Sequence, residues 1–317
     1  MKPAREDQLV GPVAGAEAGP LQRVAMQPER TARKGGLARQ VLAIIGPPLA
    51  VAAAFIGLWL LFSYVLFDPT QRFLLPPPQQ VVKVGFLDWS HLREILVNGL
   101  LPTMQVALTG LVIAIGVGMV LAIAMSQARW IERSLYPYAV VVQTIPIIAI
   151  VPLIGFILNY NFKSRVLACV MISIFPIITN TLFGLKSAEA SLQDLFRLHG
   201  AGRLTKLRKL QLPAALPAIF TGFRISAGLS VIGAIVGDFF FRQGNPGIGR
   251  LIDKYRAQLQ GEQLITAIFF SSLLGIVVFW GFGYLGNRLT RSWHESAQPE
   301  RTKWQRLPER PRGGEAV

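Results

Sequence analysis

The sequence offers few residues whose types and spacing could carry out bond-making chemistry. Its three histidines and its single cysteine lie far apart along the chain, and no pair has the spacing of metal ligands. No nucleophile with a neighbouring base is recognisable. The dipeptide Gly-Lys does not occur, so the phosphate-binding loop GxxxxGKS/T is missing. We therefore predict no catalytic residue, no metal site and no cofactor, and the sequence does not indicate an enzyme.

The polar groups that stand out lie inside long apolar runs. Gln143 and Thr144 precede Pro146, whose ring frees a backbone carbonyl group. Arg224 and Asp238 are the charged residues embedded in such runs, where an unpaired central charge costs at least about 2.5–3.5 kcal/mol on membrane-insertion scales. All of these side chains should therefore face protein or water. Gln143, Thr144, Pro146 and Asp238 are candidates for lining a solute path, although Gln143 and Thr144 could equally bond to neighbouring helices.

Asp238 is open to two interpretations, because it lies near the end of its apolar run. It could mark the membrane surface near the outer mouth, in which case its replacement by asparagine would alter transport only modestly. Alternatively, it could be half of a buried ion pair with an external arginine such as Arg242.

The elements that must position these residues are long apolar helices. Charged residues make up 15% of the chain and the mean hydropathy is +0.44, which is too apolar for a soluble domain. Six runs of about twenty or more apolar residues are present once internal proline and glycine are tolerated. They span about 41–66, 100–125, 136–158, 166–185, 217–240 and 263–287. The sequence thus predicts an all-α integral membrane protein with six transmembrane helices.

The distribution of basic residues predicts the orientation of these helices. Segments 1–40, 126–135, 186–216 and 288–317 hold 22 lysines and arginines, whereas the segments on the opposite side hold 9. Because lysine and arginine accumulate in cytosolic loops, both termini and the 186–216 loop should be cytosolic. The net charge of +15 then reflects basic segments beside anionic lipid rather than nucleic-acid binding.

The polar segment 186–216, which lies between two apolar runs, has the pattern of two short helices. One amphipathic stripe is formed by Leu192, Leu195, Phe196 and His199. Gly200 then breaks the helix, because glycine adopts left-handed dihedrals at little cost. A second short helix follows, which we expect to end at Pro213, before Pro217 opens the next membrane run. Two short helices at a sharp bend, apolar on one face and basic on another, are suited to being gripped by a partner protein.

The spacing of an acidic residue, a glycine and a Leu-Pro ending in this segment resembles the EAA loop of ABC importer permeases. The matching positions are Asp194, Gly200, Ala201, Leu210, Leu212 and Pro213. In that family the loop is a pair of coupling helices that docks into a groove of a separate ATPase subunit. The triplet in register is Asp194-Leu195-Phe196 rather than Glu189-Ala190-Ser191, so bulky residues replace the small ones usual in the family.

Other stretches resemble the branch of this family that imports sulfonates, nitrate, taurine or thiamine precursors. They are Gln143-Thr144-Ile145-Pro146, Phe175–Thr181 and Gly247–Ile252. The resemblance covers about residues 70–290 and implies a MetI-like permease bundle in the cytoplasmic membrane. It further implies a homodimer of permeases, two ABC ATPase subunits and an extracytoplasmic solute-binding protein. The solute, sulfonate- or nitrate-like on the one hand and pyrimidine- or thiamine-precursor-like on the other, stays open.

This organisation divides the chain into four parts. Residues 1–40 should be a disordered basic tail, 41–66 an anchor helix, 67–290 the permease core with five transmembrane helices, and 291–317 a second cytosolic tail. An ion-coupled secondary transporter is the alternative function. Such folds usually carry internal repeats and intramembrane carboxylates, whereas we find no convincing repeat and a single peripheral carboxylate, Asp238. A membrane-anchored scaffold that does not transport is a third alternative.

Overall fold

The structure is a computed structural model that describes residues 37–241, 243–244 and 246–294. The predicted tails 1–40 and 291–317 lie almost wholly outside these residues. All regular elements within the described ranges are helical. The chain divides into a compact unit that ends at Ala54 and a second unit that begins at Phe55, and the second unit holds every element after α1.

The first apolar segment consists of α1 (Leu37–Leu61) and the π-helical turn η1 (Phe62–Leu66). Residues Ile44–Leu66 are long and apolar enough to cross a membrane, as predicted for the apolar run 41–66. The end of the segment is tied to the proline-rich stretch that follows it. The Trp59 indole nitrogen donates to the Pro76 carbonyl at 3.1 Å, and the Ser63 hydroxyl donates to the Leu75 carbonyl at 2.8 Å.

Five continuous helical segments of the described residues could each span a membrane. They are Ile44–Leu66, Trp89–Gln127, Phe162–Lys186, Arg203–Phe240 and Gly261–Leu289. The second is built from α3 (Trp89–Arg93), the π-helical η3 (Glu94–Leu100) and α4 (Leu101–Gln127), and the third is α7 (Phe162–Lys186). The fifth lies within α12 (Gly261–His294).

The predicted span 136–158 is a bent pair of helices rather than one continuous helix. Helices α5 (Arg129–Thr144) and α6 (Ile147–Leu158) meet at an angle of 99°. Between them Ile145 and Pro146 are both extended, with φ/ψ of −66/120° and −64/117°. Proline disfavours helical dihedrals in the residue before it and has no amide hydrogen to continue the ladder, which explains the break. Counted as one span, the pair completes the six that the sequence predicts.

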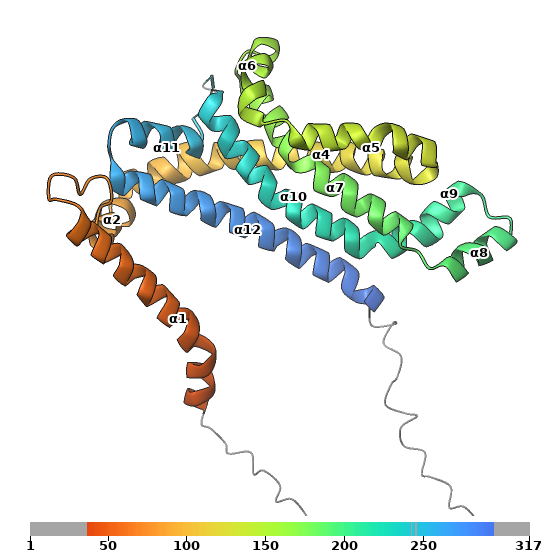
Figure 1. Cartoon of the computed structure of the whole chain (residues 1–317), viewed down its shortest axis with the longest axis horizontal. Helices are drawn as coiled ribbons and strands as arrows, with labels where there is room; N and C mark the ends of the chain where they lie inside the picture. The colour runs from red at the N-terminus through yellow and green to blue at the C-terminus, as the bar shows by residue number, and fades with distance from the viewer. Residues whose placement is uncertain (1–36, 242, 245, 295–317) are drawn as a thin grey trace, which may run out of the picture. The chain divides into compact units, whose positions relative to one another are not determined.

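The bundle is built around α4, α7, α10 (Leu212–Phe240) and α12, which run side by side, with the most extensive contact between α7 and α10 (Figure 1). Small residues allow the helices to approach closely. A Cβ atom at Gly110 would overlap the Cys169 sulfur, and one at Gly233 would lie 2.8 Å from the Cys169 Cα. Cys169 is fully buried where α4, α7 and α10 meet, where it serves as a small packing residue. Close packing of this kind drives helix association in lipid.

The second short helix of the 186–216 loop does not end at Pro213, contrary to the prediction. After α8 (Ala190–Leu198), α9 (Arg203–Lys206) and the π-helical η4 (Leu207–Gln211) continue directly into α10. Arg203–Phe240 is therefore one helical segment of 38 residues. The Leu212 amide donates to the Leu207 carbonyl in a widened turn, which places Pro213 in the first turn of α10, where its missing amide hydrogen is tolerated.

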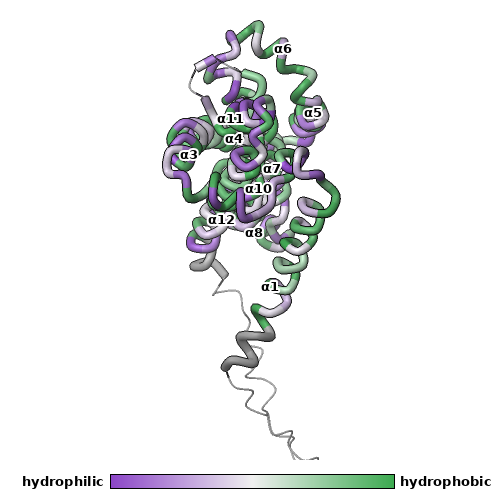
Figure 2. The backbone as a smooth tube through the Cα atoms, turned by 90° about the vertical axis from the view of Figure 1, so that its left-hand side faces the viewer, coloured by the Kyte–Doolittle hydropathy of each residue, from purple (hydrophilic) through white to green (hydrophobic). Residues whose placement is uncertain are grey.

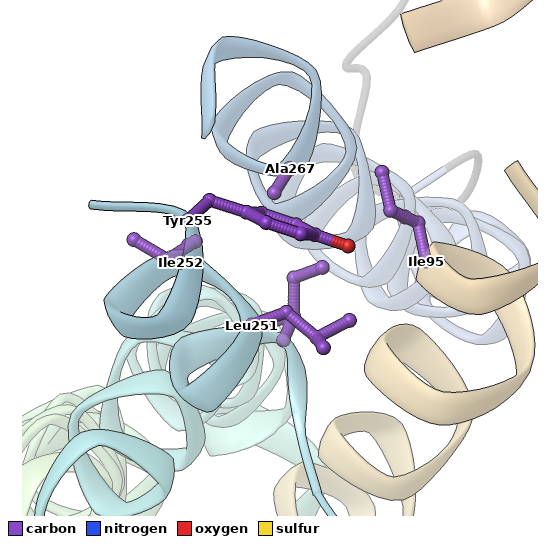
Figure 3. Close-up of a cluster of buried hydrophobic side chains, with 6 residues drawn as sticks. Ile95, Leu251, Ile252, Tyr255 and Ala267 are labelled. Carbon is purple, nitrogen blue, oxygen red and sulfur yellow. The ribbon is translucent and has the colours of Figure 1, made fainter. Parts of the chain in front are cut away.

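At the other end of the bundle a hydrophobic cluster holds α11 (Ile248–Ala257) against η3 and α12. Its buried members are Ile95, Ile248, Leu251, Ile252, Tyr255 and Ala267. Figure 3 shows the Tyr255 ring between Ala267 and Leu251. The Tyr255 hydroxyl donates to the Glu94 carboxylate at 3.0 Å, and burial together with this carboxylate raises the pKa of Tyr255 above its ordinary value. Two short elements, α2 (Pro78–Val81) and the π-helical η2 (Val82–Phe86), precede α3.

Candidate functional site

Helices α8 and α9 form a pair joined by a tight turn at Gly200, as predicted. Gly200 has a φ of +63°, in the left-handed region. Its amide donates to the Arg197 carbonyl and the Ala201 amide donates to the Phe196 carbonyl, both at 3.0 Å, which closes the end of α8. A Cβ atom at Gly200 would meet no atom within 4 Å. The backbone dihedral alone therefore creates the need for glycine here.

The two arms of this pair differ in burial. On the second arm, Leu207 and Leu210 are both buried, and Leu207 packs in a cluster with residues of α7 and α10. On α8 no residue is buried, although the helix is amphipathic. Its leucines Leu192, Leu195 and Leu198 are all exposed, Leu198 by 85%. One arm is therefore anchored to the bundle, and the other presents an apolar face that nothing in the described chain covers.

The two acidic residues at α8 are placed differently. Glu189, just before the helix, accepts a hydrogen bond from the Ser191 hydroxyl at 2.6 Å. The Asp194 side chain is exposed, and within the described ranges no hydrogen bond or ion pair engages it. Gln193, next to it, accepts a hydrogen bond from the Lys206 amine at 3.0 Å, which ties α8 to α9. Glu189 is therefore used locally, whereas Asp194 is available to a partner protein.

The remaining predicted coupling residues lie at the joints of the pair. Ala201 follows the Gly200 turn and is half-buried, and the half-buried Leu212 and Pro213 begin α10. With the buried Leu210, they connect the exposed α8 to the 38-residue helical segment Arg203–Phe240. All six predicted coupling residues thus belong to the 186–216 loop, including the first turn of α10.

The bend between α5 and α6 places three of the predicted path residues at one exposed corner. Gln143, Thr144 and Pro146 are all exposed, and α5 has no buried residue. The Thr144 hydroxyl donates to the Val141 carbonyl of its own helix at 2.9 Å. Figure 2 shows α6 as hydrophobic along its length, and its Phe156 is exposed. The corner thus combines polar side chains and an extended backbone with an apolar helix that packs one face against α7 and leaves the other exposed.

Asp238, the fourth predicted path residue, lies near the end of α10 and is only 1% exposed. Its Oδ1 lies 3.2 Å from Arg165 Nη1, and its Oδ2 accepts a hydrogen bond from the buried Thr103 hydroxyl at 2.5 Å. Arg165 Nη2 also donates to the Gln243 carbonyl at 2.9 Å. The buried ion pair, rather than the membrane-surface position, is the arrangement present. Its partner is Arg165, whereas Arg242, suggested from the sequence, lies outside the described residues.

The segment that leads into α11 is held by the same cluster. The Ile248 amide donates to the Thr103 hydroxyl oxygen at 2.8 Å, and the Gly249 amide bonds to the Asp238 carboxylate. A Cβ atom at Gly247 would overlap that carboxylate. Glycine is therefore required at 247 because the backbone approaches a buried side chain directly. Helices α4, α7, α10 and α11 meet at this one polar cluster.

Sequence reasoning did not identify Arg165 or Thr103 as partners of Asp238. They lie 73 and 135 positions away, so no local pattern connects them. Arg165 directly precedes an apolar run and looks like an ordinary turn residue. The one usable signal was physical: a carboxylate inside a transmembrane helix needs a partner.

The other embedded charge, Arg224, makes a different contact. Its guanidinium lies over the Phe279 ring of α12, 4.2 Å from the centroid. A Cβ atom at Gly283 would lie 3.1 Å from the guanidinium nitrogen Nε, so glycine leaves room for the arginine between α10 and α12. A cation–π contact with Phe279 therefore stabilises the Arg224 charge within the span.

A bundle of several helices long and apolar enough to span a membrane, with an anchored loop that exposes an amphipathic helix, is the architecture of a multi-pass membrane protein. Residues 94–291 match the family model of the binding-protein-dependent transport system inner membrane component. The chain belongs to this family, and it is a multi-pass inner-membrane permease component of an ABC importer for small solutes.

Individual relatives agree with this assignment. The formylaminopyrimidine transport permease protein ThiX of Halalkalibacterium halodurans is 35% identical over 219 residues, which cover 69% of this chain and 86% of that protein. The riboflavin transport system permease protein RibX of Chloroflexus aurantiacus is 30% identical over 231 residues, covering 71% and 82%. A solved structure of an amino acid ABC transporter has a TM-score of 0.50 at 19% identity, with 66% of this chain and 99% of that chain covered, and shows the shared fold.

Proposed function

We propose that this permease imports its solute with energy from ATP hydrolysis in a separate subunit that grips α8. Two copies of the chain form the path between them. Two ABC ATPase subunits bind the coupling loop 186–216 at the cytosolic face, and an extracytoplasmic binding protein delivers the solute at the opposite face. Both termini are cytosolic in this arrangement.

The observation that carries this proposal is the contrast between the two arms of the loop. The apolar face of α8 is uncovered, and the Asp194 carboxylate beside it is unpaired within the described chain. A groove in a partner would bury the leucines and offer hydrogen-bond donors to the carboxylate. Because Leu207 packs against α7 and α10 and Leu210 is also buried, a displacement of α8 would be transmitted to the bundle rather than only deform a loop.

The continuous helical segment from Arg203 to Phe240 offers a route for that movement. Its 38 residues correspond to a length of about 57 Å at 1.5 Å per residue. It joins the coupling loop at one end to the Asp238 cluster, and so to α11, at the other. Closure of the ATPase subunits would then rock the helical segment and switch the paired bundles between inward-facing and outward-facing states.

The solute path in this proposal runs beside the bend between α5 and α6. Gln143, Thr144 and the extended backbone at Pro146 supply polar groups there, and they become enclosed once a second copy covers the exposed face of α5 and α6. Asp238 contributes differently, because it is buried within one copy. It holds α11 in place at the outer end of the path.

The solute class that we favour is a pyrimidine-type heterocycle. The relative named for formylaminopyrimidine is 35% identical, and the relative named for riboflavin, which also contains a pyrimidine ring, is 30% identical. The relatives named for aliphatic sulfonates and bicarbonate are 25–29% identical. We expect uptake of labelled formylaminopyrimidine by cells that depend on this chain, with little competition from taurine or nitrate. Competition by taurine or nitrate alone would reverse the assignment.

The orientation can be tested by reporter fusions along the full chain. Because 22 basic residues lie on one side and 9 on the other, fusions after residues 130 and 205 should report the cytosol and fusions after 80 and 250 the outside. Alkaline phosphatase and green fluorescent protein give opposite readouts and serve as mutual controls. A cytosolic signal after residue 80 or 250 would contradict the six-span arrangement.

The energy source is tested by purifying the full chain from its native membrane in mild detergent. We expect a nucleotide-binding subunit to co-purify. Uptake by proteoliposomes that contain the complex should require ATP in their lumen. An ion-coupled transporter would instead take up solute in proteoliposomes of the chain alone, driven by a proton or sodium gradient. That result would replace the proposal.

A further inference from the structure

A cavity of about 720 Å³ lies between the first turns of α5 and the coupling loop. The end of α4, the end of α7 and residues of both arms of the loop complete its walls. Its charged lining residues are Arg129, Arg133, Lys186, Lys206 and Glu132. Four cations and one carboxylate give this cavity a formal charge of +3.

The single carboxylate is already engaged. Glu132 Oε1 lies 2.5 Å from the Lys186 amine, so these two charges compensate each other. Lys206 donates only to the neutral Gln193. Arg129 and Arg133 are exposed, and no ion pair or hydrogen bond joins them to another described residue. Three cationic groups thus converge on the cavity without a counter-charge.

The donors around the cavity match the chemistry of a phosphate group. Arginine offers a planar fork of N–H donors to the oxygens of an oxyanion, and lysine adds a compact point charge. The half-exposed Tyr136, also in the wall, adds a neutral hydroxyl. Water alone would leave three like charges close together without compensation, which is unfavourable.

Aromatic residues on α5 indicate that the cavity lies at the level of the lipid headgroups. Trp130 is 71% exposed and Tyr138 70% exposed, on the same helix as Arg129 and Arg133 but outside the cavity wall. Exposed tryptophan and tyrosine concentrate at the level of lipid headgroups. Basic pockets between transmembrane helices on the cytosolic side are suited to phospholipid headgroups.

We propose that this cavity is a binding site for a phosphate-bearing anion, supplied either by the headgroup of an anionic phospholipid or by free phosphate. The anion would join Arg129 and Arg133 of α5 to Lys206 of the loop and so stiffen the coupling pair against the bundle. The proposal rests on the cytosolic placement of the loop in the proposed function. Binding of the anion at this site would then regulate the coupling between the loop and the bundle.

The test uses the purified full chain without any partner. Native mass spectrometry counts phosphatidylglycerol retained from mixed phosphatidylglycerol and phosphatidylcholine nanodiscs, and equilibrium dialysis measures binding of labelled inorganic phosphate. We expect Arg129→Gln/Arg133→Gln to weaken the bound anion by about tenfold or more, as loss of charged hydrogen bonds does. The matched control Arg208→Gln/Lys209→Gln removes the same charge from the neighbouring coupling loop, outside the cavity, and should bind like the wild type.

A second variant keeps the proposal testable if the double variant fails to fold. Glu132→Gln removes the one carboxylate and releases Lys186, so it should bind the anion several-fold more tightly. Retention of phosphatidylglycerol without competition by phosphate identifies the lipid as the source, and saturable phosphate binding identifies the free anion.

Two results would overturn the proposal: no preference of the wild-type chain for phosphatidylglycerol or phosphate, or equal losses in the cavity variant and its control. The first result would point instead to a cavity suited to an acidic side chain of a protein partner, which is absent from the assay. No ATPase takes part in the assay, so a failure of ATPase coupling would leave its outcome unchanged.

Discussion

Gly200→Val should leave the bundle folded and inserted while ATP-dependent uptake falls by about tenfold or more. Valine at a φ of +63° strains the backbone by about 1–2 kcal/mol, which the chain relieves by shifting the turn and displacing α8. The anchored arm, Leu207 and Leu210, is not affected directly, because no atom lies within 4 Å of a Cβ at Gly200. Gly200→Asn is the matched control, since asparagine tolerates left-handed dihedrals, and it should retain most of the uptake.

Asp194→Lys is expected to reduce the association with the ATPase subunit just as strongly, through the contact itself rather than through the turn. Asp194 is exposed, so the change should alter the stability of the permease by less than about 0.5 kcal/mol. Glu189→Lys reverses the same charge five positions earlier, where the carboxylate bonds only to Ser191, and should be mild.

Co-purification yield of the ATPase subunit, ATPase rate and solute uptake separate these effects. Loss of association, or hydrolysis without uptake, is the expected result for Gly200→Val and Asp194→Lys. Equal and mild effects of all three changes would indicate an ordinary solvated loop. A sensitive Glu189 with a tolerant Asp194 would show that the register assigned to the coupling motif is wrong.

Hydrophobic runs and local turn chemistry were sufficient to predict most of the fold. Each span is a long apolar segment, and Gly200 has a local reason to break a helix, since nothing but its own dihedral demands glycine. The same local rules misjudged the two prolines near helix ends. Pro213 was expected to stop a helix, but a π-helical turn at 207–211 lets the helix pass through it. Pro146 was placed inside one span, but the chain bends there by 99°.

The partners of buried polar groups could not be predicted in the same way. Local periodicity reports which face of a helix is apolar but not which helix covers it. Asp238 therefore looked peripheral, because its sequence neighbourhood shows only the end of an apolar run. Arg165, Thr103 and the backbone at Gly249 reach it from other parts of the fold. The cationic cavity escaped notice for the same reason, since its arginines and lysines lie on separate helices and look like ordinary cytosolic charges.

Asp238→Leu should be the most destabilising single substitution in the half of the bundle that holds α11, by about 3–5 kcal/mol. The leucine leaves Arg165 buried without its carboxylate and removes the acceptors for the Thr103 hydroxyl and the Gly249 amide. Arg165→Met should be comparably harmful, because it leaves the carboxylate unpaired. The midpoint of thermal unfolding in detergent, followed by loss of the monodisperse peak in size-exclusion chromatography, measures both.

The double variant Arg165→Met/Asp238→Leu distinguishes an ion pair from two independent core positions. With neither charge left in the apolar interior, much of the lost stability should return, because two apolar side chains avoid the desolvation of the pair. Arg256→Met is the control: it breaks the pair with Asp253 at a guanidinium that is 70% exposed, and should change the midpoint little. Additive losses in the double variant would show that the two residues do not act as a pair. A wild-type midpoint for Asp238→Leu would instead restore the interpretation of Asp238 as a residue of the membrane surface. Solute uptake by the double variant is a further test. Because the cluster positions α11, we expect the double variant to fold but to import its solute slowly.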